Sequence, residues 1–361
     1  MKKIVILGST GNIGQQALEI IRAFPKELKV IGLTANKNKE LLAKQVKEFK
    51  PVAFGLGESE LTKISTLKEA DLILVAVVGL AGLAPTLTAI SAKKNIALAT
   101  KEVMVVAGEL VVKEAKKNKI SLIPIDSEHS AIFQCLRAGH KNEVKRIILT
   151  MGKGRFAAMS NQELKKITLK DIYLKRTWMM GEKITIDSAT CLNKSFEIIE
   201  AKWLFDLPPE KIDVIVHPEY LCHSMVEFCD GSIVAEIGTA DMRRYIQYAL
   251  FYPERKEARA TSFSDLLNKK ISFEPAPYKK FPGLSLGFKA LNAGGTMPAV
   301  LHGADDSAVK EFIKGKIKFT DIPKIIEQTI QNHIVIKNAQ LEEILKAEEW
   351  GRNYALRLCS G

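Results

Sequence analysis

Over the first 125 residues, short apolar runs alternate regularly with amphipathic stretches. Runs such as "KKIVILG" and "LKVIGLTA" have the length and β-branched content of buried strands. Stretches such as "IGQQALEIIRAF" lie between them and have helical periodicity. This alternation is typical of a parallel sheet whose strands are joined by crossover helices. We therefore predict a doubly wound α/β domain over residues 1–125.

From about residue 143 the pattern changes to strands without intervening helices. The runs "EVKRIILTM", "KIDVIVHP" and "SMVEFCDGSIVAEIG" read as antiparallel strands, and the last one turns at Asp230-Gly231, a strong hairpin signal. After Pro298 the pattern is mostly helical. We predict a central α+β domain over residues 126–290 and a small helical C-terminal domain over residues 291–361.

The composition fits a globular protein that acts on a small anion. The 361 residues are 47% hydrophobic and 26% charged, and no apolar run approaches the roughly 20 residues of a membrane span. Five cysteines without framework spacing are expected in a reducing compartment, so we predict a cytoplasmic protein. The net charge of +12 comes from scattered lysines, which favours a phosphorylated small-molecule substrate over nucleic acid.

A glycine-rich turn joins the first predicted strand to the first predicted helix. In "ILGSTGNIGQQ", Gly8, Gly11 and Gly14 let the turn close and let backbone N–H groups approach a pyrophosphate at the helix start. This position predicts a Rossmann-like cofactor domain. The second strand ends in "TANKN", which has no carboxylate for a ribose 2′-hydroxyl but has Lys37 for a 2′-phosphate. The expected cofactor is therefore NADPH.

Two carboxylates flank one serine in "IPIDSEHSAIFQ". Asp126 and Glu128 follow a predicted strand, and like charges placed so close together need a positive partner. Oxygen ligands without nearby cysteine or histidine pairs favour Mg²⁺ or Mn²⁺ over zinc. The later segment "KITIDSATCLNKSFEIIEA" offers three candidates for a third carboxylate, and these are Asp187, Glu197 and Glu200.

Several long motifs occur in an order that resembles one known family. They are "GSTGNIG", "PIDSEHSAIFQ", "WMMGEKITIDSATCLNKSFEIIEA", "HPEYLCHSMVEFCDGS", "DMRRYIQYAL" and "LNAGGTMPAVL". Together they look like 1-deoxy-D-xylulose 5-phosphate reductoisomerase, and the resemblance runs from residue 1 to about residue 357. It implies NADPH- and divalent-metal-dependent conversion of 1-deoxy-D-xylulose 5-phosphate to 2-C-methyl-D-erythritol 4-phosphate, a step of isoprenoid biosynthesis. It also implies a homodimer.

The resemblance assigns roles to residues at matching positions. The implied metal ligands, for Mg²⁺, Mn²⁺ or Co²⁺, are Asp126, Glu128 and Glu197. The implied catalytic residues are Lys101, Glu128, Lys175 and Trp178, and the last two lie in a mobile lid around residues 175–182. The implied substrate contacts are Lys101, Ser127, Glu128, Gly152, Lys175, Ser188, Asn193, Lys194 and Glu197. The implied cofactor contacts are Thr10, Gly11, Asn12, Ile13, Asn36, Lys37, Asn38, Thr100, Glu102 and Gly181.

The chain departs from the family pattern mainly around the expected phosphate site. Gly152 replaces a serine, Lys175 replaces a histidine, and Lys153 and Arg155 are added cations. Thr100 replaces the asparagine of "LANKE", and "VLHGADD" replaces an Asn-Ala-Ala-Asn-Glu pattern. Residues 51–72 are also short for the family.

These departures leave two alternatives beside the reductoisomerase. The first is a paralogue that carries out the same chemistry on a different ketose or branched-sugar phosphate. The second is a non-catalytic sensor of NADPH or a sugar phosphate, which the retained carboxylates disfavour. Turnover that requires a metal ion would separate the sensor from the two enzymes.

Overall fold

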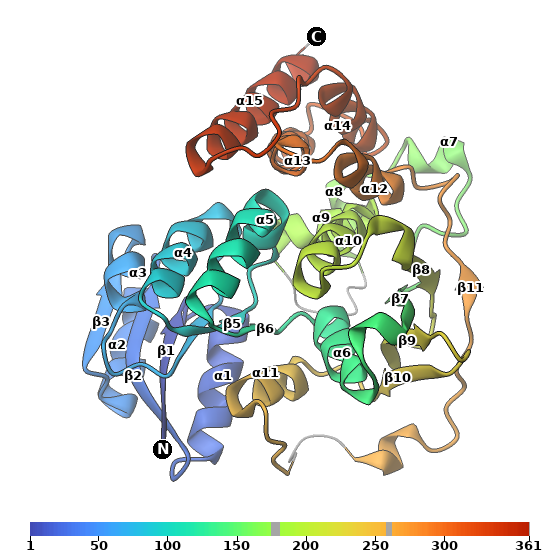
Figure 1. Cartoon of the computed structure of the whole chain (residues 1–361). Coiled ribbons are helices and arrows are strands. Elements are labelled where there is room, and N and C mark those ends of the chain that lie inside the picture. The colour runs from blue at the N-terminus through green and yellow to red at the C-terminus, as the bar shows by residue number, and fades with distance from the viewer. Residues whose placement is uncertain (175–180, 258–261, 361) are drawn as a thin grey trace. The chain divides into compact units, whose positions relative to one another are not determined.

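The structure is a computed structural model that describes residues 1–174, 181–257 and 262–360. The chain, whose helices and strands are labelled in Figure 1, divides into two compact units, each built from separate stretches of sequence. The first unit comprises Met1–Met104, Gly108–Ile147 and Tyr220–Ile271. The second comprises Val105–Ala107, Ile148–Glu219 and Ser272–Gly361. The three-domain division at residues 125 and 290 stays a prediction beside this grouping.

A six-stranded sheet with the strand order β3-β2-β1-β4-β5-β6 forms the centre of the first unit. All neighbouring strands run parallel, as the alternating pattern predicted. The strands are β1 (Lys2–Leu7), β2 (Leu28–Ala35), β3 (Ala53–Leu56), β4 (Leu72–Val75), β5 (Asn95–Leu98) and β6 (Leu122–Pro124). The order reverses between β1 and β4, and open α/β sheets bind ligands beside such a switch point.

Helices cover both faces of this sheet. They are α1 (Asn12–Ala23), α2 (Lys39–Phe49), α3 (Glu58–Ser65), α4 (Leu83–Ser91), α5 (Lys101–Asn118) and α11 (Met242–Phe251). Helix α6 (Ser127–Cys135) follows the edge strand β6. Ile4 and Ile6 of β1 belong to one buried cluster with residues of α1 and α11. The alternate residue Val5 instead lies near Ile64 of α3, on the opposite face. The sequence pattern did not predict that α11, more than 100 residues later, completes this core.

The expected hairpin is present in the first unit. Strands β9 (Cys222–Phe228) and β10 (Ile233–Ile237) pair antiparallel. The Asp230 carboxylate accepts a hydrogen bond from the Ser232 N–H at 2.9 Å, and Gly231 has a φ of +87°, which glycine adopts without strain. Strand β7 (Val144–Met151) carries the chain from the first unit into the second.

The second unit is mainly helical. Its helices are α7 (Asn161–Leu164), α8 (Leu169–Tyr173), α9 (Glu182–Ala189), α10 (Leu192–Phe205), α12 (Gly283–Ala293), α13 (Met297–Ile313), α14 (Asp321–Gln331) and α15 (Leu341–Ser360). Strands β8 (Ile212–Val216) and β11 (Glu274–Pro275) pair antiparallel. The helical C-terminal segment is therefore confirmed. In the described part of the chain, no helix is both long and apolar enough to cross a membrane.

Candidate active site

Asp126 and Glu128 lie where the sequence placed them, directly after the edge strand β6 of the parallel sheet. Asp126 is the N-cap of α6, and its Oδ1 accepts a hydrogen bond from the Ser127 N–H at 3.0 Å. The Ser127 hydroxyl donates to Glu128 Oε2 at 2.5 Å. Both carboxylates thus stand at the carboxyl edge of the sheet, in the first turn of one helix, with Ser127 hydrogen-bonded to each.

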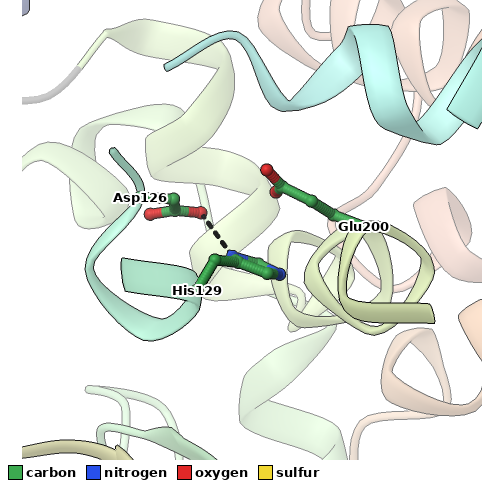
Figure 2. Close-up of side chains that lie close together, drawn as sticks. All are labelled: Asp126, His129 and Glu200. Atoms are coloured by element: carbon green, nitrogen blue, oxygen red, sulfur yellow. Dashed lines mark ion pairs between the residues drawn. The ribbon is translucent and has the colours of Figure 1, made fainter. Parts of the chain in front are cut away.

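The positive partner that the sequence argument required is a lysine. The Lys101 ammonium, at the start of α5, lies 2.9 Å from Asp126 Oδ2. Figure 2 shows the second partner of this oxygen, Nδ1 of the fully buried His129, at 3.6 Å. Burial alone would raise the pKa of Asp126, but Lys101 and His129 outweigh it and hold the pKa well below its ordinary range. The carboxylate is therefore ionised and available to a cation at neutral pH.

The glycine-rich turn has the geometry that a bound pyrophosphate needs. Gly8 has a φ of +89°, and a Cβ at this position would lie 2.4 Å from the Ala76 carbonyl oxygen. A Cβ at Gly14 would lie 2.3 Å from the Gly8 oxygen, so only glycine lets the turn pack on α1. The first turn of α1 has neither a side-chain cap nor an acidic residue, so its N-terminus favours an anion.

All three expected cofactor residues at the end of β2 are exposed, and one of them also has a structural role. Asn36 and Lys37 are exposed directly after β2. Asn38 is exposed too, and its side-chain oxygen caps α2 by accepting a hydrogen bond from the Leu41 N–H at 3.1 Å. Lys37 is thus the cation at this strand end that fits a 2′-phosphate.

Thr100 is buried, and its hydroxyl bonds to backbone inside the protein. It donates to the Val77 carbonyl at 2.6 Å, in the turn that follows β4. Glu102, two residues further along, is half-buried in the first turn of α5. Thr100 therefore holds the turn after β4, and this role was not visible in the sequence.

In the second unit, α9 and α10 carry four expected site residues. Ser188 is exposed near the end of α9 and donates to the Ile184 carbonyl at 2.7 Å. On α10, the buried Lys194 ammonium donates to the Thr150 carbonyl at 2.6 Å and pairs with Glu197. The Asn193 amide also donates to Glu197, whose side chain is 1% exposed. The helical spacing predicted this shared face of Lys194 and Glu197.

The added cations near residue 152 have protein partners. Gly152 follows directly after β7, and the Lys153 ammonium lies 2.7 Å from Glu274 Oε1 of β11. The Arg155 guanidinium donates to the carbonyls of Asp171 and Ile172 in the last turn of α8. Lys175 and Trp178, and with them most of the expected lid, lie outside the described residues. Gly181 is exposed at the N-cap of α9.

Of the three carboxylates considered as a third metal ligand, Asp187 has a different partner. It lies 2.7 Å from the Lys183 ammonium one turn earlier on α9, and Lys183 also pairs with Asp305 of α13. The i,i+4 spacing signals the first of these pairs, but no sequence pattern signals the second. Glu197 and Glu200 are both buried on α10.

The chain matches three family profiles that together cover most of its length. "1-deoxy-D-xylulose 5-phosphate reductoisomerase" matches residues 4–56 and 52–108. The "1-deoxy-D-xylulose 5-phosphate reductoisomerase C-terminal domain" matches residues 122–205, and the "DXP reductoisomerase C-terminal domain" matches residues 237–354. The chain belongs to the 1-deoxy-D-xylulose 5-phosphate reductoisomerase family.

Full-length relatives of the family agree. The 1-deoxy-D-xylulose 5-phosphate reductoisomerase of Thermoanaerobacter sp. (strain X514) is 47% identical over an alignment of 370 positions that covers 97% of each chain. The enzyme of Caldanaerobacter subterraneus subsp. tengcongensis is 45% identical over an alignment of 378 positions that covers 99% of each chain. The relatives span the whole chain, so the match includes both units.

Solved structures of the family have the same fold. The reductoisomerase of Zymomonas mobilis in complex with NADPH matches with a TM-score of 0.93 and 36% identity, over 100% of this chain and 99% of that one. A reductoisomerase in complex with NADPH, fosmidomycin and magnesium matches with a TM-score of 0.91 and 33% identity, over 100% and 98%. The resemblance predicted from the motifs is therefore confirmed, and so is the α/β fold class.

Proposed function

We propose that this chain is an NADPH- and divalent-metal-dependent reductoisomerase that converts 1-deoxy-D-xylulose 5-phosphate to 2-C-methyl-D-erythritol 4-phosphate. The observation that carries the proposal is 47% identity to a family enzyme over 97% of both chains, with all three candidate metal ligands retained. The reaction rearranges the carbon skeleton of a ketose phosphate to a branched aldehyde. NADPH then transfers a hydride to the aldehyde carbon, and the oxygen takes up a proton.

The first unit provides all but one of the residues proposed to bind NADPH, and the exception is Gly181. The N-terminus of α1 has neither a side-chain cap nor a nearby acid, so the backbone around Thr10, Gly11, Asn12 and Ile13 suits the pyrophosphate. Asn36, Lys37 and Asn38 follow β2, and Lys37 supplies the cation that a 2′-phosphate needs. We also retain Thr100, Glu102 and Gly181 as cofactor-site residues, with Thr100 acting through the Val77 carbonyl.

Three carboxylates are proposed to hold the metal ion, and these are Asp126, Glu128 and Glu197. They offer hard oxygen donors, which Mg²⁺ and Mn²⁺ prefer. Each carboxylate already accepts a hydrogen bond or pairs with a cation, so each is held in a fixed orientation. When bound, the dication supplies Lewis-acid polarisation of the two adjacent substrate oxygens.

The substrate phosphate is proposed to bind to α9 and α10. Ser188, Asn193 and Lys194 offer a hydroxyl, an amide and an ammonium group close together in sequence. Gly152 offers only its backbone N–H where the family has a serine, and Lys175 adds a cation from the lid segment. Lys101 and Ser127, which contact the Asp126 and Glu128 carboxylates, are proposed to face the reacting carbons.

The paralogue with another substrate is not favoured by the geometry. The main reason to consider a different substrate was the group of added cations. However, Lys153 pairs with Glu274, and Arg155 donates hydrogen bonds to carbonyls in the last turn of α8. Neither cation therefore has to be explained by an extra negative charge on the substrate. Of the cations that depart from the family pattern, this leaves Lys175, and a lysine still binds phosphate as a point charge.

We also propose a homodimer that works in the cytoplasm. The hairpin β9–β10 has an edge strand, β10, on which Ile233 and Ile237 are 55% and 42% exposed. Exposed apolar residues on an edge strand favour pairing with another chain. Sedimentation of the purified protein at micromolar concentration measures this directly: a mass near 80 kDa, twice 40.0 kDa, is expected.

The decisive experiment follows NADPH absorbance at 340 nm with purified full-length protein, Mn²⁺ and 1-deoxy-D-xylulose 5-phosphate. We expect rapid oxidation that stops when EDTA removes the metal and returns with added Mn²⁺. Asp126→Ala and Glu197→Ala should each lower kcat/KM at least 100-fold, because each removes a proposed ligand. Glu342→Ala, at an exposed position on α15, is the matched control. If the wild-type protein oxidises no NADPH with this substrate, the proposal is wrong.

A further inference from the structure

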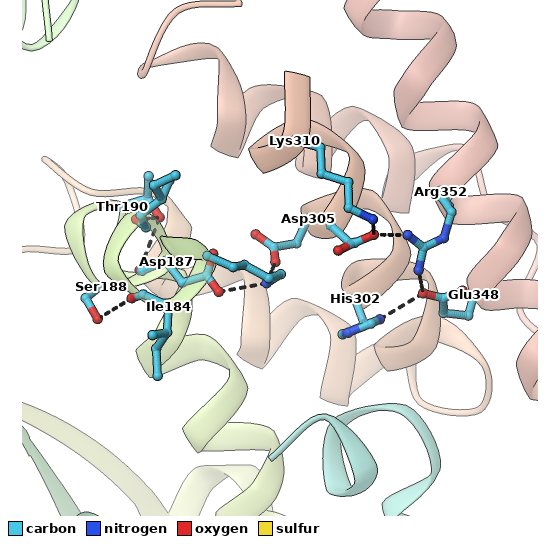
Figure 3. A network of polar contacts seen from close by, with 12 residues as sticks. Ile184, Asp187, Ser188, Thr190, His302, Asp305, Lys310, Glu348 and Arg352 are labelled. Atoms are coloured by element: carbon cyan, nitrogen blue, oxygen red, sulfur yellow. Dashed lines mark hydrogen bonds and ion pairs between the residues drawn. The ribbon is translucent and has the colours of Figure 1, made fainter. Parts of the chain in front are cut away.

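A half-buried lysine connects the start of α9 to α13. The Lys183 side chain is 24% exposed, and its ammonium faces two carboxylates, Asp187 one turn later at 2.7 Å and Asp305 of α13 (Figure 3). It also lies 5.0 Å from the centre of the Phe196 ring. Although burial opposes the charged form, the two carboxylates raise the pKa of Lys183 above its ordinary range. We call Lys183, Asp187 and Asp305 the α9 clamp.

The burial of the Asp305 carboxylate is unfavourable for the stability of the fold. Its side chain is fully buried, and one of its oxygens has no hydrogen-bond partner within the part of the chain that the structure describes. Two buried acids thus share one cation, and burying the second carboxylate costs more free energy than burying an amide. The family pattern Asn-Ala-Ala-Asn-Glu has an amide here, whereas this chain has "HGADD". Asp305 therefore carries a buried charge where the family pattern carries none.

The clamp restrains the helix that carries a proposed phosphate ligand. Asp187, which pairs with Lys183, fixes the second turn of α9. Ser188, which is proposed to bind phosphate, is the next residue. The Thr190 hydroxyl donates to the Ile186 and Asp187 carbonyls, and Cys191 then turns the chain with a φ of +64° into α10. Movement of α9 against α13 would therefore displace Ser188 first and α10 next.

We propose that Asp305 is a positioning residue for the substrate phosphate. Together with Asp187 it fixes Lys183 and so holds α9 against α13, which places Ser188 for its hydrogen bond to phosphate. Gly152 has no side chain that could bind phosphate, so more of the affinity depends on the accurate placement of Ser188. This inference rests on the proposed function, because it concerns the same phosphate site.

The test compares two substitutions that each remove one negative charge from α13. Asp305→Asn weakens the clamp. Asp306→Asn, the matched control, removes the neighbouring carboxylate, which pairs with Lys310 and Arg352. For Asp305→Asn we expect KM for 1-deoxy-D-xylulose 5-phosphate and Kd for fosmidomycin to rise about tenfold, with kcat and KM for NADPH within twofold. For Asp306→Asn we expect all four values to stay within twofold.

A double-mutant cycle with Ser188→Ala separates positioning from a general loss of structure. If Asp305 acts through Ser188, Asp305→Asn should change Kd for fosmidomycin less than twofold in the Ser188→Ala background. Equal effects in both backgrounds, or an unchanged Kd in the single variant, would overturn the inference. If Asp305→Asn fails to fold, Lys183→Arg, which keeps the charge but alters the geometry, replaces it in the same cycle. Absent turnover by the wild-type protein refutes the proposed function, whereas the fosmidomycin cycle still tests the clamp.

Discussion

Single side chains hold the loops around the proposed cofactor site. Thr100 stands where the family motif has asparagine, and its buried hydroxyl donates to the Val77 carbonyl at 2.6 Å. Val77 follows β4, at the carboxyl end of the sheet, where the cofactor is proposed to bind. The shorter threonine thus holds this turn by a direct bond to its backbone.

Removal of this hydroxyl should weaken NADPH binding. Thr100→Ala loses one buried hydrogen bond worth about 1 kcal/mol, so we expect KM for NADPH to rise about fivefold. Steady-state kinetics with varied NADPH measure the change, and Thr100→Ser, which keeps the hydroxyl, should stay within twofold of the wild-type value. An unchanged KM in the alanine variant would show that the Val77 turn does not depend on Thr100.

The charge of Lys153 should matter little to the substrate. Its ammonium and the Glu274 carboxylate are 55% and 43% exposed, and such surface pairs contribute about 0–1 kcal/mol. For Lys153→Ala we therefore expect KM for 1-deoxy-D-xylulose 5-phosphate to change less than twofold. Lys194→Ala is the positive comparison and should raise this KM more than tenfold. A large rise in this KM for Lys153→Ala would instead indicate that Lys153 contributes to phosphate binding.

At the scale of elements, glycines set how closely helices of the second unit pack. A Cβ at Gly303 of α13 would lie 2.0 Å from the Glu348 carbonyl oxygen of α15, and one at Gly351 would lie 2.6 Å from the Val300 carbonyl oxygen. The two glycines therefore let the backbones of α13 and α15 approach each other. On the polar side of the same pair, His302 and Arg352 both bond to Glu348 (Figure 3).

Gly303→Ala should destabilise this helix pair. The added methyl group meets backbone that cannot move aside by a rotamer change, so we expect a loss of about 1–3 kcal/mol in the free energy of unfolding. The gain in helix propensity, up to about 1 kcal/mol, offsets only part of this loss. Denaturant unfolding followed by circular dichroism measures the difference.

Lys310→Ala, at an exposed position on the same helix, is the control for this measurement. It should change stability by no more than about 0.5 kcal/mol. If Gly303→Ala were as stable as the wild-type protein, α13 and α15 would have room to separate, and the close packing would not limit the second unit.

At the scale of the whole molecule, the sequence predicted secondary structure and neighbouring contacts well, but it predicted contacts between distant segments poorly. The parallel sheet, the β9–β10 hairpin and the shared face of Lys194 and Glu197 all follow from periodicities within about 30 residues. The return of α11 to the core of the first unit does not, and Lys183 and Asp305 are 122 positions apart. Such pairs depend on how elements pack, about which a local pattern carries no information.

The candidate site was predictable to a similar degree. Motifs placed Asp126 and Glu128 correctly at the start of α6, because a strand end followed by a helix is a local pattern. The same motifs gave no sign that Lys101 is the cation beside Asp126, since the two are joined only through the pairing of β5 with β6. The family profile also matches in two pieces that overlap at residues 52–56, which agrees with the short segment noted after residue 51.

Four thiols make the stability of the whole molecule sensitive to alkali. Burial raises the pKa of Cys135 and Cys191 to about 12 and that of Cys222 and Cys359 to about 11. In the unfolded chain a thiol titrates near pH 8.5. The unfolded state therefore loses protons first as the pH rises, so the stability that is present below about pH 8 decreases between pH 8.5 and the folded pKa values.

Between pH 7.5 and 9.5 we expect each of these four thiols to lower the free energy of unfolding by about 1 kcal/mol. Guanidinium unfolding under reducing conditions at both pH values measures the total. Cys135→Ala should reduce this pH dependence by about one quarter, whatever the cavity costs at either pH, because it removes one of four titrating thiols. Cys229 is exposed, so Cys229→Ala should leave the pH dependence unchanged. An equal pH dependence in the two variants would mean that Cys135 ionises as readily in the folded protein as in the unfolded chain. The burial of Cys135 at the end of α6 should prevent this.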